Sequence, residues 1–309
     1  MSGSRSPGQS GVPASGGPAG LAVIAAAGLA ITIWAGTPIV TKIAVAEIDA
    51  LSVGLLRTVV AAALVAPLLA LSRARFPFPG SASGVALLLV SGGAGFVAFP
   101  LLFSLGVERT SSAHAALIIA AAPVFSGLIG AAAERRRPAR RWWLGVALAL
   151  AGEYLLVDLR LGLGGAGASV GGDLLVLASC LAAAAGYVAG GRLSRTIGTW
   201  AATLWGLTLA ALGLVPVLAW RAVSADWLPR DLAGWSAIGY LAALSSLLAY
   251  ACWYWALGSG GITRVAASQF AQPVMSLALA VVVLNEAITL SLALTAVLIV
   301  VGVAIAQGR

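Results

Sequence analysis

The sequence predicts an all-α polytopic membrane protein with ten transmembrane helices, arranged as two inverted repeats of five helices. Composition is the first reason: 61% of the 309 residues are hydrophobic and only 9% are charged, which is more apolar surface than a soluble domain can bury. Apolar windows long enough to cross about 30 Å of hydrocarbon also recur along the whole chain. Arginines gather between these windows in an alternating pattern.

Residues 1–20 are rich in Gly, Ser and Pro, and we expect them to form a disordered cytoplasmic tail. They lack the charged start and apolar run of a signal peptide, so the first apolar window should stay in the protein. The first repeat is predicted over 21–160, a Gly-rich linker over 161–172, and the second repeat over 173–309. The ten windows lie at about 21–43, 52–72, 83–106, 111–133, 142–159, 173–191, 199–220, 234–257, 264–284 and 287–306.

Loop arginines predict the orientation of these helices. With a cytoplasmic N-terminus, the segments on the cytoplasmic side hold twelve arginines and the segments on the other side hold four. This bias places both termini in the cytoplasm, with Arg137 cytoplasmic and Asp226 extracellular. Because five is an odd number, the second repeat then starts on the opposite side of the membrane. Alternating-access transporters use this inverted arrangement, with the site near the repeat interface.

The window at about 264–284 contains the strongest candidates for a binding site. At 3.6 residues per turn, Gln269, Gln272 and Ser276 share one face. An amide that faced lipid would lack hydrogen-bond partners, so this face should contact other helices or a cavity. Pro273 cannot donate to the carbonyl four residues earlier, so the Gln269 carbonyl is predicted to be free. The alternative is that both amides only hold neighbouring helices together.

Short motifs occur in both halves of the chain in a fixed order. They are WAGTPIVTK (34–42), Arg57 in the second window, the run from Ser111 through Pro123 to Glu134, GDLLVLASCLAAAAGYV (172–188), AYACWYWALGSGG (249–261), QPV with NEAIT (272–289), and the closing VVGVAI. In this order and spacing they resemble EamA-type proteins of the drug/metabolite transporter superfamily, over nearly the whole chain from Leu21.

The resemblance implies two inverted five-helix bundles that move small organic molecules across the cytoplasmic membrane, often outward. It also implies a central cavity lined by helices 1–4 and 6–9, with helices 5 and 10 at the periphery. We therefore expect a secondary active transporter, and an exporter, of a small polar metabolite such as an amino acid. The expected partners are this substrate and the lipid bilayer, with a homodimer left open. No nucleic acid is expected, since orientation explains the net charge of +8. No metal or cofactor is expected either, and the single histidine cannot build a multi-histidine metal site.

Five further residues are candidates for substrate binding beside the two glutamines. Trp34 and Thr37 lie along the first helix near a mid-span proline, Phe99 lies in the third, and Tyr250 and Trp253 lie in the eighth. Each has a plainer interpretation. Phe99 is one of three aligned phenylalanines that could simply pack, and Trp253 could belong to an interfacial aromatic belt.

Lys42 and Arg57 lie toward the outer ends of the first two helices, close in sequence to Glu47 and Asp49. They could form a cationic collar for an anionic group. Alternatively, both side chains could extend toward the membrane surface and pair there with these carboxylates.

His114 and Glu153 are candidates for proton coupling. His114 has a pKa near physiological pH, and Glu153 is an acidic residue well inside a span. Either could instead be neutral and hydrogen-bonded to a neighbouring helix. Glu134, at the end of the fourth helix, is expected to pair with the arginine cluster that directly follows it, at 135–141.

Two other function classes fit parts of the sequence. Ser111 or Ser112 near His114 could form a catalytic dyad of an intramembrane enzyme, although no third group or oxyanion loop is visible. A non-transporting scaffold is the other alternative, which the inverted duplication disfavours. The absence of a phosphate-binding G-x-x-x-x-G-K-[ST] motif means that a gradient or exchange must drive transport.

Overall fold

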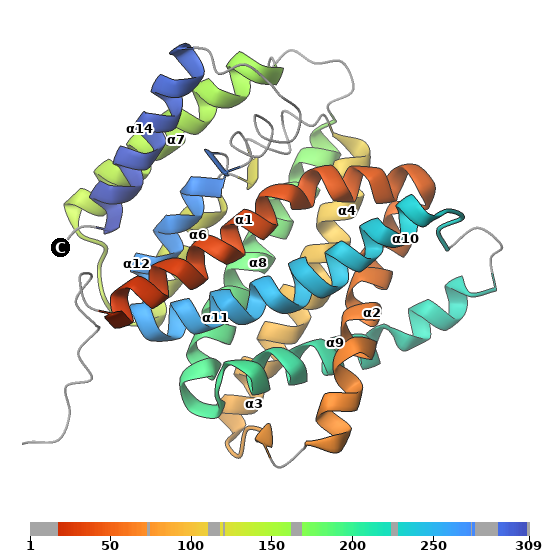
Figure 1. The fold of residues 1–309 in the computed structure, drawn as a ribbon. Helices are drawn as coiled ribbons and strands as arrows, with labels where there is room; N and C mark the ends of the chain where they lie inside the picture. The colour runs from red at the N-terminus through yellow and green to blue at the C-terminus, as the bar shows by residue number, and fades with distance from the viewer. Residues whose placement is uncertain are drawn as a thin grey trace, which may run out of the picture.

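The computed structural model describes residues 18–72, 75–110, 118–119, 121–161, 169–223, 228–272, 274–275 and 290–307. These ranges are all-helical (Figure 1), which confirms the predicted fold class. Six of the helical stretches in them are long and apolar enough to cross a membrane. They are 19–47, 50–71, 82–109, 170–197, 199–221 and 232–260.

The helices follow the predicted windows but are mostly longer at their ends. The first half contains α1 (Pro18–Glu47), α2 (Ala50–Leu71), α3 (Ala82–Val90), η2 (Ser91–Ala98), α4 (Phe99–Arg109), α6 (Ala122–Ala133) and α7 (Arg140–Leu161). The second half contains α8 (Val170–Ile197), α9 (Thr199–Arg221), α10 (Leu232–Gly239), η3 (Tyr240–Leu248), α11 (Ala249–Gly260), α12 (Ile262–Ala266), η4 (Ala267–Ala271) and α14 (Leu290–Gln307).

The third and eighth predicted windows each contain a stretch in the middle that is not wound as an α-helix. η2 and η3 are π-helical segments that continue directly into α4 and α11. π turns are rare and are found frequently at functional sites. Both halves of the chain therefore have the same irregularity at the same place.

The same two spans also begin alike. Ser81 and Asp231 each accept a hydrogen bond from the backbone N–H three residues later, which belongs to Gly84 and Gly234 respectively. A proline precedes each capping residue by two positions. A Cβ added to Gly84 would lie 2.8 Å from Pro79, and one added to Gly234 would lie 2.7 Å from Pro229. A proline, a capping side chain and a glycine thus define one repeated helix start.

α7 and α14 lie side by side at the edge of the molecule (Figure 1). Gly145 approaches Ala306, and Ala149 approaches Gly302, so the two helices run antiparallel. Small residues at a spacing of four bring the two backbones together, as is common between membrane helices. The structure thus confirms the peripheral position that the resemblance implied for helices 5 and 10.

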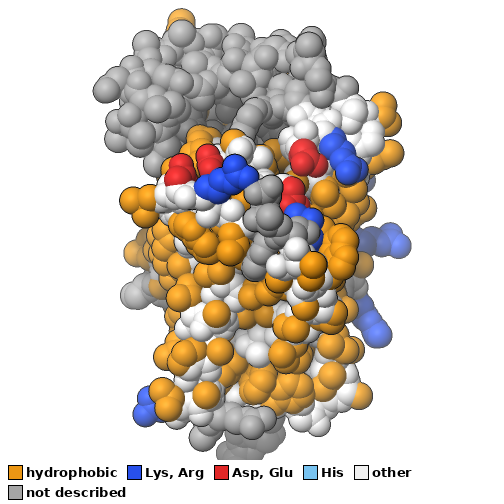
Figure 2. All heavy atoms as spheres, turned by 90° about the vertical axis from the view of Figure 1, so that its right-hand side faces the viewer, with side chains coloured by type: hydrophobic (Ala, Val, Ile, Leu, Met, Phe, Trp, Pro, Cys, Tyr) orange, Lys and Arg blue, Asp and Glu red, His pale blue; other side chains and the backbone are white. Residues whose placement is uncertain are grey.

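The two ends of the bundle differ in charge. Figure 2 shows apolar side chains over the middle of one face, with acidic side chains gathered toward one end. At this end the Asp49 carboxylate lies 2.5 Å from Arg221 Nη2, and Glu47 lies close to the start of α10. At the opposite end, six arginines line one cavity. They are Arg136, Arg137, Arg141, Arg192, Arg195 and Arg264.

Candidate transport site

Aromatic rings from three spans meet in the centre of the bundle. Trp34 of α1 stacks on Tyr187 of α8 with ring centroids 5.3 Å apart, and it contacts the edges of Tyr250 and Trp253 of α11 at 5.5 Å each. Trp253 is fully buried in the protein, so its interpretation as part of an interfacial aromatic belt is wrong. Tyr187 was not among the sequence candidates, yet its ring completes this cluster.

Arg57 lies inside the bundle with only 1% of its surface exposed. Its Nε donates to Ser246 Oγ at 3.2 Å and its Nη2 donates to Ser245 Oγ at 3.1 Å. The guanidinium carbon lies 5.8 Å from the centre of the Phe99 ring, within range of a cation–π contact. Its Nη1 has no hydrogen-bond partner, and no carboxylate pairs with Arg57, among the residues that the structure describes.

The prediction that Arg57 extends to the surface and pairs with Glu47 or Asp49 is therefore wrong. Arg57 is the eighth residue of α2 and lies roughly 10 Å along the helix from its first residue. At this depth its side chain points into the protein and donates to two serines. The side chain of Lys42 lies outside the described residues, and so does its proposed role.

Asp49 instead caps α2 and binds Arg221. Its carboxylate accepts from Ser52 N at 3.0 Å and from Ser52 Oγ at 2.7 Å. Partial burial opposes ionisation, but the Ser52 hydrogen bonds and the Arg221 charge outweigh it and lower the pKa of Asp49. Asp49 is the acidic residue closest to Arg57 in sequence, and it bonds to Ser52 and Arg221 at the end of the bundle instead.

Ser245 connects the aromatic cluster to Arg57. Its carbonyl accepts from Trp34 Nε1 at 3.1 Å, and its hydroxyl lies 3.1 Å from Thr37 Oγ1. Ser245 and Ser246 follow each other in the π-helical η3, and both reach the same guanidinium. The sequence signal for this site was a pair of serines in an otherwise apolar stretch.

The two glutamines contact the same region from η4 and the residue that follows it. Gln272 Nε2 donates to the Trp34 carbonyl at 3.2 Å. Gln269 is buried, and its Oε1 has no partner in the described part of the chain. The prediction of a free Gln269 carbonyl is wrong, because the 3₁₀ winding of η4 lets it accept from the N–H of Gln272. Pro273 and Ser276 lie outside the described residues.

A small cavity lies between these groups. Its polar and aromatic walls come from both halves of the chain: Trp34, Thr37, Phe99, Phe103, Tyr187, Ser245, Gln269 and Gln272. The cavity volume is about 30 Å³, which suits one or two water-sized groups and no larger molecule. Phe99 and Ser245, which line the cavity, also contact Arg57. A larger molecule could enter only if the helices moved apart.

Comparison with known proteins shows what kind of protein contains this cavity. The model of the EamA-like transporter family matches residues 21–158 and again residues 170–307. The chain belongs to the EamA-like transporter family. It is therefore a membrane transporter with two copies of the family's domain, and this membership decides against the enzyme and scaffold alternatives.

Individual relatives of this EamA-like transporter agree with the assignment. The chain is 31% identical to the uncharacterized transporter YdeK of Bacillus subtilis (strain 168), over 91% of its own length and 94% of that protein. It is 27% identical to an uncharacterized transporter of Archaeoglobus fulgidus, over 84% and 88% of the two chains. A solved crystal structure at 23% identity covers 93% of this chain and 96% of its own, with a TM-score of 0.74, and supports the fold.

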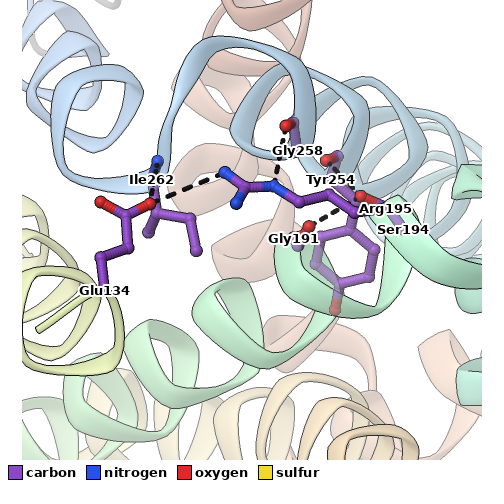
Figure 3. Close-up of polar contacts among 7 residues, drawn as sticks. All are labelled: Glu134, Gly191, Ser194, Arg195, Tyr254, Gly258 and Ile262. Carbon is purple, nitrogen blue, oxygen red and sulfur yellow. Dashed lines mark hydrogen bonds and ion pairs between the residues drawn. The ribbon is translucent and has the colours of Figure 1, made fainter. Parts of the chain in front are cut away.

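At the arginine end of the transporter, Glu134 joins separate helices (Figure 3). Its Oε1 accepts from the N–H of Ile262 at 3.3 Å and lies 3.6 Å from Arg195 Nη2. Arg195 Nε in turn donates to the Gly258 carbonyl at 2.9 Å. We refer to Glu134, Arg195, Gly258 and Ile262 as the latch, because they tie the ends of α6, α8, α11 and α12 together.

The expected pairing of Glu134 with the arginine cluster after it is not observed among the described residues. α6 ends at Ala133 with Glu134 as its C-cap, and Arg135 adopts a left-handed backbone with φ 52°. Glu134 pairs with Arg195 of α8 instead. Two other sequence candidates cannot be placed. His114 and the side chain of Glu153 lie outside the described residues, as do the serines considered for a catalytic dyad.

Proposed function

We propose that this EamA-like transporter exports a small polar metabolite with an anionic group, such as an amino acid, by secondary active transport. The observation that carries the proposal is the buried Arg57 guanidinium. A buried charge costs several kcal/mol unless it is paired, and Arg57 has no carboxylate partner among the described residues. A substrate carboxylate would supply the missing partner. Outward transport is the direction that the likeness to drug/metabolite transporters favours.

The other groups around the cavity suit a zwitterion. Thr37, Ser245, Gln269 and Gln272 offer neutral donors and acceptors, which bind polar groups without a second charge to desolvate. The stacked rings of Trp34 and Tyr187 offer an electron-rich face to an ammonium group. An amino acid would thus place its carboxylate toward Arg57 and its ammonium toward the rings.

The size of the cavity and the contacts at the two ends of the bundle support transport by alternating access. The latch ties the helices at the arginine end, and the Asp49–Arg221 pair ties α2 to α9 at the other. A cavity of about 30 Å³ cannot hold an amino acid, so loading requires one of these ends to open. We infer that transport breaks the two sets of contacts in turn.

Counterflow in proteoliposomes tests the proposed substrate class. The purified transporter is loaded with unlabelled compounds, and uptake of a labelled amino acid is measured against a panel of free amino acids and their amides or methyl esters. We expect the free amino acids to exchange, and the amides and esters, which have lost the carboxylate charge, to fail. Equal exchange of acids and esters would contradict a role for Arg57 as the partner of a substrate anion.

We propose that the arginine end faces the cytoplasm, with both termini on that side. Cysteines placed at Arg137 and Asp226, in a variant with Cys180 and Cys252 replaced by alanine, test this orientation. A membrane-impermeant maleimide should label Asp226→Cys in intact cells and Arg137→Cys only after permeabilisation. The opposite labelling pattern would contradict the orientation that the arginine bias predicts.

Gln272→Ala should weaken substrate binding more than it weakens folding. The Gln272 side chain reaches the cavity wall at Trp34, and a neutral hydrogen bond contributes about 0.5–1.5 kcal/mol, or roughly 2–12-fold in affinity. Affinity and melting temperature should be measured together. Ser268→Ala is the matched control, because Ser268 is in η4 but does not line this cavity. A lower melting temperature with unchanged affinity would mean that Gln272 only packs helices together.

A further inference from the structure

A second cavity opens at the arginine end of the transporter, outside the proposed transport site. Its volume is about 650 Å³, and its charged lining comprises six arginines and Glu134. The arginines come from four separate places: the connection after α6, the start of α7, the end of α8, and α12. Orientation in the membrane requires a number of loop arginines, but it does not require them to meet around one hollow.

The single carboxylate of this cavity is already engaged. Glu134 pairs with Arg195 and accepts from Ile262 N, and Arg195 also donates to Gly258 (Figure 3). Arg136, Arg137, Arg141, Arg192 and Arg264 have no carboxylate partner among the residues that the structure describes. One guanidinium group can donate two parallel hydrogen bonds to a phosphate. Several unpaired arginines around one cavity therefore suit a phosphate better than a single carboxylate.

An apolar groove adjoins the arginine cavity and shares Gly260 and Arg264 with it. The volume of the groove is about 260 Å³, and its walls are almost entirely apolar residues of α1, α12, η4 and α14. It follows α1 from Gly20 to Ile31, roughly 16 Å along the helix. A Cβ added at Gly28 would meet nothing within 4 Å, so the groove has room beside this glycine.

We propose that these two hollows together bind one anionic phospholipid. Its phosphate lies among the arginines, and one acyl chain lies in the groove along α1. Basic pockets at the membrane-facing ends of helices bind acidic lipid headgroups, and the groove adds a place for hydrocarbon that a free anion would not need. The bound lipid touches both halves of the chain and lies beside the latch.

This proposal is tested by adding lipids to the purified, delipidated transporter in detergent. Binding is measured by native mass spectrometry and by the melting temperature of the transporter. Phosphatidylglycerol should bind and raise the melting temperature. Phosphatidylcholine of the same chain length should bind at least about tenfold more weakly, because it lacks the net charge. Inorganic phosphate should stabilise far less, because it leaves the groove empty. These readouts do not involve transport, so they are independent of the proposed substrate.

Two sets of variants separate the headgroup from the chain. Arg136→Gln with Arg137→Gln should weaken phosphatidylglycerol binding at least about tenfold, while Arg109→Gln at the opposite end should not. Gly28→Trp should fill the groove and weaken lipid binding, whereas Gly213→Trp, another open helix position, should leave it unchanged. Equal binding of the two lipids, equal stabilisation by inorganic phosphate, or full lipid binding by Gly28→Trp would each overturn the proposal.

Discussion

Arg57→Gln is expected to reduce transport of a carboxylate substrate by roughly 12–150-fold, the effect of losing a charged hydrogen bond of about 1.5–3 kcal/mol. The glutamine amide nitrogen can take the place of Arg57 Nε and still bond Ser246, so the core keeps a polar group there. The substitution also removes a buried charge that has no carboxylate partner in the described structure. The melting temperature should therefore stay the same or rise while transport is lost.

The measurement compares initial uptake per folded molecule with the melting temperature in detergent. Arg57→Lys keeps the charge but loses the fork that spans the two serines, so it should retain part of the activity. Ser246→Ala is the matched control for the packing around Arg57, and it should cost little transport. If Arg57→Gln unfolds the protein while transport per folded molecule is unchanged, Arg57 is a structural residue and the substrate anion binds elsewhere.

Gly302→Leu is expected to give the largest loss of stability among simple substitutions. A Cβ at this position would lie 2.6 Å from the backbone nitrogen of Ala149 and 2.7 Å from the carbonyl of Gly145. Backbone atoms cannot rotate away as a side chain can, so α14 must separate from α7. Overpacking typically costs about 1–3 kcal/mol, and a clash with backbone atoms should place Gly302→Leu at the upper end of this range.

Thermal unfolding in detergent checks this prediction. Gly213→Leu in α9 is the matched control, because a Cβ added at Gly213 meets nothing within 4 Å, and this substitution should leave stability unchanged or slightly higher. No residue of α14 lines the transport cavity, so the small fraction of Gly302→Leu that folds should still bind substrate. A melting temperature equal to that of the control would show that α7 and α14 do not depend on close backbone contact.

Much of the fold could be predicted because membranes impose simple rules. The length and composition of the apolar windows predicted the helices. The arginine bias assigned several loops to the same side of the membrane, and the structure places arginines from these loops around one cavity. Trp34 and Gln272 were identifiable as polar or aromatic residues near prolines inside apolar spans. The structure places both residues on the wall of the central cavity.

The errors arose where winding departs from 3.6 residues per turn. The burial of Arg57 was missed because its position near the start of α2 suggested the surface, while its partners Ser245 and Ser246 lie in the π-helical η3, about 190 residues away in sequence. The 3₁₀ turn of η4 likewise gave the Gln269 carbonyl a partner that an α-helix would not. Tyr187 was overlooked because a single tyrosine in an alanine-rich span gives no periodic signal.

The matching π-helical segments carry information about ancestry. η2 and η3 lie at the same place in the third helix of each half, after the same proline, cap and glycine. A π turn adds a residue to a helix and rotates the residues beyond it. The chain contains two copies of one family domain, and two copies of one domain account for a π-helical segment at the same place in each. The Tyr250 hydroxyl donates to the Gly95 carbonyl of η2 at 2.8 Å, so the two copies bond to each other at one of these segments.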